Sequence, residues 1–256
     1  MDNTSPLLSW VWASIAIYAV VANTGWLAVW LTGPHGTLVR WLTSLPGQLL
    51  IWAAKLLWLV LPGYIALIQG RLSPRQLGLS QFALNWELGR GLLFATTALV
   101  VFVAAGITYR RSHSAIRPYL SFSHGLALTV MLVMLAGALQ WQWAFYRSVL
   151  IDLLAARGVA TPVYAGTWLT VVVIAAQGAL NLWLWRDLRT PGRAESRVLR
   201  AALLGVSSVL YLLSRNFWLA WLLHALVTAI LEPRTAANKK GSRQLNVTGS
   251  LSAQDQ

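Results

Sequence analysis

The residues of this sequence that could do chemistry lie inside an apolar stretch, Leu139–Asp152, which continues the apolar run Leu126–Leu139 without a break. This stretch contains two amides, a guanidinium and a carboxylate: Gln140, Gln142, Arg147 and Asp152. One long helix at membrane depth would carry all four. Polar and ionisable groups are costly there and usually face a partner or a cavity. We therefore expect the functional site on this helix.

Four further polar residues interrupt later apolar runs: Gln177, Asn181, His224 and Thr228. They form two pairs with i, i+4 spacing, so the members of each pair lie on one face of a helix. The pair Gln177–Asn181 is typical of hydrogen bonding between helices in a membrane. Because these helices can converge on the one that carries Gln142 and Arg147, the sequence predicts a shared polar site inside the bundle.

The composition indicates an all-α, polytopic integral membrane protein. Of the 256 residues, 57% are hydrophobic, only 11% are charged, and 15 are Trp. Soluble domains average about 45–50% apolar and about 25% charged residues. The sequence has no Cys, which excludes disulfides and thiolate metal sites. Its four His show no metal-binding spacing, so no metal and no cofactor are expected.

The formal net charge of +13 has an explanation other than nucleic-acid binding. The basic residues fall in loops between apolar runs, which is typical of membrane proteins. In those loops they can contact the head groups of membrane lipids. No basic patch with interleaved aromatic residues stands apart from the apolar runs, so we discount nucleic acid as a partner.

The apolar runs predict about seven transmembrane helices in one bundle, residues 1–231, followed by a disordered tail, residues 232–256. The expected helices are Pro6–Leu31, Leu49–Gln69, Glu87–Tyr109, Ser123–Ala156, Val163–Trp185, Val198–Leu213 and Phe217–Leu231. Seven crossings place thirteen Lys and Arg residues on one side and five on the other. The positive-inside rule then predicts that the N-terminus lies outside and the tail in the cytoplasm. The membrane itself we expect to be a prokaryotic inner membrane.

The segment Gln142-Trp143-Ala144-Phe145-Tyr146-Arg147 resembles the first motif of the CPBP family, the CAAX-protease and bacteriocin-processing proteins, which are glutamic intramembrane proteases. That motif reads Glu-Glu-x-x-x-Arg. Arg147 matches it, whereas Gln142 and Trp143 stand where the family has its two glutamates. The resemblance thus covers the spacing and the arginine but not the acidic pair.

Two later segments are similar to the other motifs of the family. Val173-x-x-x-Gln177 resembles Phe-x-x-x-His, with Gln in place of His, and His224-x-x-x-Thr228 resembles His-x-x-x-Asn. The resemblance covers residues 71–231 and implies a shared helical core. The family-like flanks of His224 favour a place in a pocket over a simple hydrogen bond between helices.

The resemblance implies that active relatives use a glutamate and a histidine to activate water, and a second His and an Asn to stabilise the oxyanion. A general base must accept a proton near neutral pH, and a glutamine amide cannot do so. Gln142 and Gln177 could orient a water or a peptide carbonyl without generating hydroxide. We therefore expect a polar pocket without a catalytic residue, formed by Gln142, Arg147, Gln177, His224 and Thr228.

The resulting hypothesis is a non-catalytic CPBP-like protein that binds a membrane-embedded peptide or partner protein, as an accessory to protein sorting, maturation or immunity. One alternative is an active endopeptidase with an altered site, which requires a water-filled cavity that reaches Gln142, Gln177 and His224. Another is a structural subunit or assembly factor of a membrane complex, which requires wide apolar faces. For Arg147 the alternative to a place in the pocket is a structural role, in which its guanidinium clamps its helix to the backbone carbonyl groups of a neighbouring helix.

Overall fold

The computed structural model describes residues 4–33, 35–80, 86–112 and 126–231. Within these ranges the chain is helical and has no strand, which confirms the all-α prediction. The helices are α1 (Thr4–Thr32), α2 (Thr37–Thr43), α3 (Leu45–Ile68), α4 (Trp86–Ser112), α5 (Leu126–Ala156), α6 (Pro162–Ala179), α7 (Leu182–Leu188), α8 (Pro191–Ser214) and α9 (Phe217–Leu231). The predicted start of the fourth helix at Ser123 and the predicted tail lie outside the described residues.

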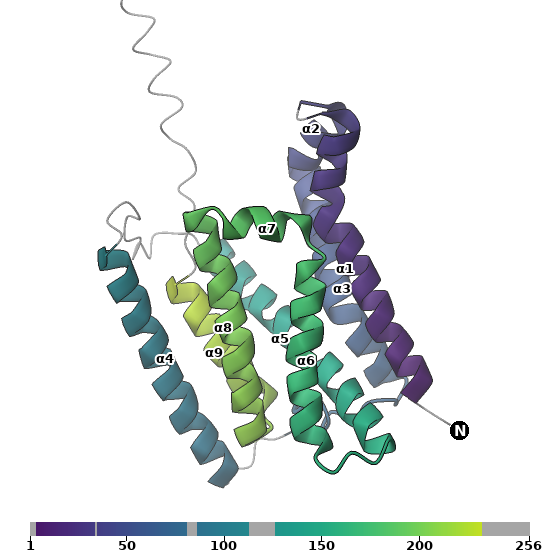
Figure 1. The fold of residues 1–256 in the computed structure, drawn as a ribbon, viewed down its shortest axis with the longest axis vertical. Coiled ribbons are helices and arrows are strands. Elements are labelled where there is room, and N and C mark those ends of the chain that lie inside the picture. Colours follow the sequence, from purple (N-terminus) through teal and green to yellow (C-terminus); the bar gives the residue numbers. More distant parts are fainter. Residues whose placement is uncertain (1–3, 34, 81–85, 113–125, 232–256) are drawn as a thin grey trace, which may run out of the picture.

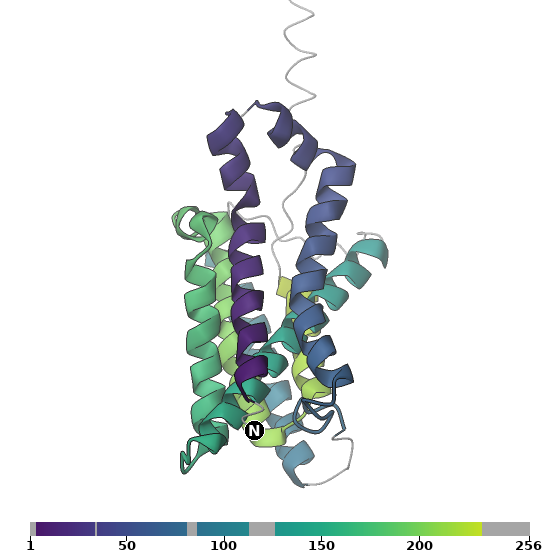
Figure 2. The same ribbon diagram turned by 90° about the vertical axis from the view of Figure 1, so that its right-hand side faces the viewer.

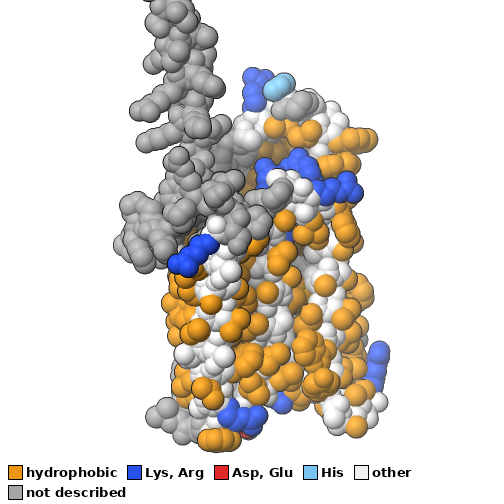
Figure 3. Space-filling view, turned by 60° about the vertical axis from the view of Figure 1, so that its left-hand side comes forward, with side chains coloured by type: hydrophobic (Ala, Val, Ile, Leu, Met, Phe, Trp, Pro, Cys, Tyr) orange, Lys and Arg blue, Asp and Glu red, His pale blue; other side chains and the backbone are white. Residues whose placement is uncertain are grey.

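Five of these helices are long and apolar enough to cross a membrane, namely α1, α3, α4, α6 and α8. This finding supports an integral membrane protein. On the face shown in Figure 3, hydrophobic side chains cover the middle of the molecule, and Lys and Arg side chains gather toward its two ends. Seven crossings would require α5 and α9 as well, and that number stays a prediction.

Helix α5 lies at the centre of the bundle, where it contacts α1, α3, α6 and α9. Every residue from Gln142 to Leu150 is buried. The 31 residues of α5 correspond to about 46 Å of helix, more than the ~30 Å of hydrocarbon in a bilayer. A helix of this length is accommodated by tilting, and α5 runs obliquely across the bundle (Figures 1 and 2).

The prediction of one helix over Val163–Trp185 is wrong, because the chain breaks between α6 and α7. Asn181 Oδ1 accepts a hydrogen bond from the backbone N–H of Trp183 at 2.9 Å and so caps α7. The side chain of Asn23 on α1 bonds the carbonyl before Asn181 and the N–H after it, both at 2.9 Å. Asn181 is therefore a helix cap rather than a residue inside a longer helix. As a result, α7 turns across the end of the bundle (Figure 1).

Helix α8 begins at Pro191, earlier than the predicted start at Val198, so much of the expected polar loop is helical. Asp187 of α7 holds the first turns of α8 in place. Its Oδ2 accepts a hydrogen bond from Arg197 Nη2 at 2.7 Å, and its Oδ1 accepts one from Arg193 Nη1 at 3.3 Å. Partial burial alone would raise the pKa of Asp187, but the hydrogen bonds and charges of the two arginines outweigh it and lower that pKa below its usual value.

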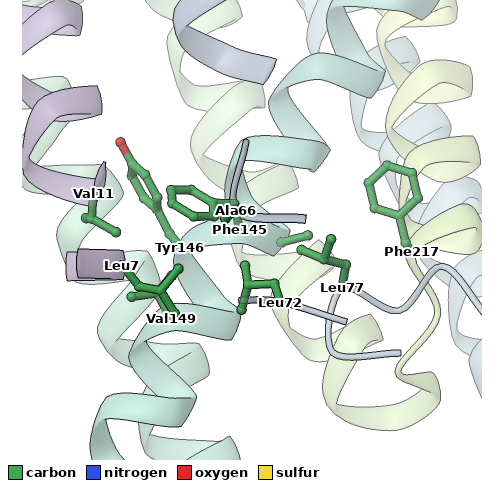
Figure 4. Packing of buried hydrophobic residues seen from close by; sticks show 10 residues of the cluster. Leu7, Val11, Ala66, Leu72, Leu77, Phe145, Tyr146, Val149 and Phe217 are labelled. Atoms are coloured by element: carbon green, nitrogen blue, oxygen red, sulfur yellow. The ribbon is translucent and has the colours of Figure 1, made fainter. Parts of the chain in front are cut away.

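The turn over residues 70–80 packs against α5 and against the connection between α8 and α9. It lies at the end of the molecule where the N-terminus lies (Figure 2). Leu72 and Leu77 of this turn are almost fully buried in a cluster with Phe145 and Phe217 (Figure 4). The carbonyl of Gly78 accepts a hydrogen bond from the N–H of Phe217 at 3.1 Å. The turn is therefore part of the core, although its sequence is polar.

Replacement of Gly78 by Ala is predicted to destabilise the protein more than replacement of Gly70. Both glycines have positive φ angles, +79° and +66°, so either alanine should cost about 1–2 kcal/mol in backbone strain. Only at Gly78 would the added Cβ also lie 2.6 Å from a backbone oxygen, that of Arg215. The free energy of unfolding in mixed detergent micelles measures both costs, and equal losses for the two variants would show that the turn is not packed against α8 and α9.

Candidate functional site

The first polar group of the core joins α5, α8 and α9 through Gln140. The Nε2 atom of Gln140 donates to Ser207 Oγ at 2.8 Å and lies 3.0 Å from Nδ1 of His224. All three side chains are buried. An amide nitrogen can only donate, so Nδ1 of His224 is the acceptor and the imidazole proton sits on Nε2. Trp143 stacks on the imidazole with a centroid distance of 5.2 Å.

The second polar group joins α5 to α1 and contains Gln142. The hydroxyl of Tyr146 donates to Ser14 Oγ at 2.8 Å, and Gln142 Nε2 donates to the Tyr146 oxygen at 3.1 Å. Figure 4 shows the Tyr146 hydroxyl pointing toward α1 beside Val11. Gln177 approaches the same hydroxyl from α6, while its own Nε2 is buried without a hydrogen-bond partner among the described residues.

The third polar feature is Arg147, whose side chain is only 4% exposed. Its guanidinium carbon lies 3.8 Å from the ring centroid of Tyr211 on α8, a cation–π contact. Its Nε and Nη1 atoms have no hydrogen-bond partner within the described chain. The structure therefore shows a stack on an aromatic ring, not the clamp to backbone carbonyls that we considered from the sequence.

The structure places four of the five predicted pocket residues in these three groups and leaves Thr228 outside them. Gln142 and Gln177 both adjoin Tyr146, whereas His224 belongs to the Gln140 group and Arg147 to Tyr211. Thr228 is buried one helical turn beyond His224. Among the described contacts, no hydrogen bond joins one group to another. The bundle thus brings only two of the five side chains to a common neighbour.

Sequence reasoning missed the partners of these residues. Ser14, Ser207, Tyr146 and Tyr211 supply the hydroxyls and the ring that the polar side chains of α5 contact. Their only signal is that hydroxyl groups occur inside apolar runs. Such residues can also bond the preceding turn of their own helix, as Ser208 does with the carbonyl of Leu204 at 2.8 Å, so the residue type alone does not identify a partner.

A cavity of about 320 Å³ lies beside the turn over residues 70–80, and Tyr211 of the third polar group is part of its lining. Its lining comes from that turn, the C-terminal part of α5 and the end of α8: Ser73, Arg75, Gln76, Ser148, Ile151, Asp152, Tyr211 and Arg215. Gln76 Nε2 donates to Asp152 Oδ2 at 2.9 Å across it. None of the predicted pocket residues lines this cavity, but Asp152, the carboxylate of the apolar stretch Leu139–Asp152, does.

Within the described residues, no group of three or more His, Cys, Asp or Glu side chains could hold a metal ion. No family model, no curated protein and no solved structure matches the chain. The resemblance to the CPBP family therefore stays a prediction.

Replacement of Gln140 by Leu is predicted to destabilise the bundle by about 0.6–2 kcal/mol, because it leaves Nδ1 of His224 buried without a donor. Adding His224→Phe to that variant should recover part of the loss, since an apolar ring needs no donor and can still stack on Trp143. A double-mutant cycle on the free energy of unfolding in mixed micelles measures this coupling. Strictly additive losses would contradict the hydrogen bond between the two side chains.

Proposed function

We propose that this chain is a non-catalytic integral membrane protein that binds a membrane-embedded helix of a partner protein or peptide. The observation that carries the proposal is a gap in the ring of helices around α5. That ring runs through α3, α1, α6, α8 and α9, each in contact with the next, but within the described residues α9 makes no contact with α3. Among the described elements, no helix covers this side of α5, and we infer that it faces the membrane.

The exposed stripe of α5 lies in this gap. Val130 and Met134 are 51% and 60% exposed, and Met131 is 37% exposed, a set spaced as i, i+1 and i+4 on one helix face. On one side of the stripe, the carbonyl of Val133 accepts a hydrogen bond from Trp221 of α9 at 3.2 Å. On the other side, Leu135 and Ala138 pack in a cluster with Trp58 of α3.

The chemistry of the gap fits an apolar helix. The half-buried Trp141 lies at the end of this stripe. It contacts both neighbouring helices, because its indole donates to the carbonyl of Val60 on α3 at 3.0 Å and its ring meets Phe217 of α9 edge-on. The indoles of Trp218 and Trp221 also donate to backbone carbonyls. With these donors engaged, the face offers apolar contacts, and flexible methionines suit a surface that packs against another helix.

Hydrolysis has less support than binding. A neutral imidazole has one lone pair that can take a proton, and in His224 that lone pair already accepts a hydrogen bond from Gln140. No carboxylate within the described chain contacts His224, and Gln142 belongs to a different polar group. A general base must reach the proton that it removes. An active endopeptidase would need these side chains to rearrange.

The finer topology also belongs to the proposal. We infer seven crossings, with α5 and α9 added to the five long apolar helices, in a prokaryotic inner membrane. The end that carries α2 and α7 would face the cytoplasm and the N-terminus would lie outside. The excess of Lys and Arg in the loops and tail of that side supports this orientation. The order and spacing of the motifs around Arg147 and His224 support an origin within the CPBP family.

Photocrosslinking in native membranes tests the binding face. A photoreactive residue at Met134 or Val130, which are 60% and 51% exposed on the stripe of α5, should give protein adducts of one defined mass. The matched control is Leu93 on α4, which is 71% exposed and should give only lipid adducts. Adducts of equal yield at all three positions would contradict a partner in the gap and favour a structural subunit covered on several faces.

A second experiment tests the absence of catalysis. The purified chain, reconstituted in liposomes with a membrane-spanning peptide, is expected to leave the peptide intact, and His224→Ala should not change that result. Mass spectrometry of the peptide provides the measurement. Cleavage by the unmodified chain that disappears in the His224→Ala variant would overturn the non-catalytic proposal.

A further inference from the structure

The cavity beside the turn over residues 70–80 has a well-fixed frame. Ser148 Oγ donates to the carbonyl of Gln76 at 3.0 Å, which ties the turn to α5. The indole of Trp218 donates to the carbonyl of Leu79 at 3.0 Å, which ties it to α9. Arg215 adopts a left-handed conformation at the end of α8, with φ of 51°, and its N–H bonds the carbonyl of Tyr211 at 2.8 Å. Contacts within the protein thus hold the walls of the cavity in place without a ligand.

Three neutral polar side chains of the lining, those of Ser73, Gln76 and Ser148, are already hydrogen-bonded within the protein. Ser73 Oγ accepts from the N–H of Gln76 at 3.2 Å, and the amide of Gln76 donates to Asp152. Ser148 donates to two backbone carbonyls, those of Gln76 and Ala144. A ligand in this cavity would therefore find its free polar partners among the charged side chains.

Three charged side chains line the cavity without an ion pair to any described residue. These are Arg75, which is exposed, and the half-buried Arg215 and Asp152. Arg215 and the buried Arg147 both lie over the ring of Tyr211, with their guanidinium carbons 5.4 Å and 3.8 Å from its centroid. The lining thus combines two guanidinium groups with one carboxylate, and Arg147 adds a third positive charge at Tyr211, outside the lining.

We propose that this cavity binds a zwitterionic head group with a phosphate and a primary ammonium, as in a phosphatidylethanolamine lipid. Guanidinium groups pair with phosphate oxygens through two parallel hydrogen bonds, and Arg75 and Arg215 are free to do so. Asp152 would accept hydrogen bonds from the ammonium through its unbonded Oδ1. The location favours a lipid, because the turn that lines the cavity lies at one end of the bundle (Figure 2), where the head groups of a surrounding bilayer would meet it. This inference does not depend on the partner proposed for the gap between α3 and α9.

The carboxylate is what makes the site selective. A choline head group carries the same phosphate, but its methylated nitrogen cannot donate a hydrogen bond to Asp152. A glycerol head group has no positive charge and would leave the carboxylate unpaired beside the phosphate. A hydrogen bond between two charged groups is stronger than one between neutral groups, so we expect the ethanolamine lipid to bind about tenfold more tightly than either of the others.

Titration of the full-length protein in neutral detergent micelles tests the proposal. Short-chain phosphatidylethanolamine, phosphatidylcholine and phosphatidylglycerol are added separately, and native mass spectrometry gives the bound fraction of each. The wild type should prefer the ethanolamine lipid by about tenfold. Asp152→Asn should abolish that preference while the glycerol lipid still binds, and Glu87→Gln is the matched control that should preserve it. Equal binding of the three lipids by the wild type would overturn the proposal.

The arginines are tested with the same lipids. Arg75→Gln changes an exposed side chain that no described residue holds, so it should fold normally and weaken binding of all three lipids, as should Arg215→Gln. Arg157→Gln removes an exposed charge outside the cavity lining and should have no effect. An equal loss in the Arg75 and Arg157 variants would overturn the site. Binding of free phosphoethanolamine as tight as that of the lipid would overturn the lipid assignment.

Discussion

The polar side chains buried on α5 must find their hydrogen-bond partners inside the protein, because the hydrocarbon of a membrane offers none. Gln140 does so with Ser207 of α8 and His224 of α9. One half-turn further on, Gln142 and Tyr146 do so with Ser14 of α1. These contacts point to opposite parts of the bundle. They fix both the rotation of α5 and the positions of the helices around it, and the apolar side chains pack on the arrangement that results.

The same contacts decide what the core can do. A side chain that is held by a buried hydrogen bond stabilises the helix pair, but the atom that makes this bond is then not available to a substrate. This holds for Nδ1 of His224, which accepts from Gln140, and for Nε2 of Gln142, which donates to Tyr146. Arg147 is different, since it is buried over Tyr211 with two nitrogen atoms that no described residue bonds. The proposed ligands are therefore expected at the surface of the bundle, in the gap between α3 and α9 and in the cavity that Tyr211 helps to line.

The sequence was sufficient to predict helices and a membrane setting, because long apolar runs have few other solutions. It was also sufficient to single out Gln140, Gln142, Arg147 and His224 as unusual. Their partners could not be predicted, since rotating α5 about its axis by the angle of one residue would turn these side chains toward other helices. The break at Asn181 depends on two hydrogen bonds of Asn23, whose partners Leu180 and Leu182 lie 157 and 159 positions away in the sequence. No local sequence pattern could therefore indicate the break. The early start of α8 similarly depends on Asp187 and its two arginines.

The central claim is that the hydrogen bond from Gln140 holds His224 as a structural acceptor. Nitrogen-15 solid-state NMR of the labelled histidine in lipid bilayers at neutral pH measures this directly. We predict a single neutral tautomer for His224, with the proton on Nε2, an unprotonated Nδ1 and a shift of the Nδ1 resonance in the Gln140→Leu variant. A proton on Nδ1, or an imidazolium that exchanges with water, would contradict the account, because it would mean that the imidazole is free to act as a base.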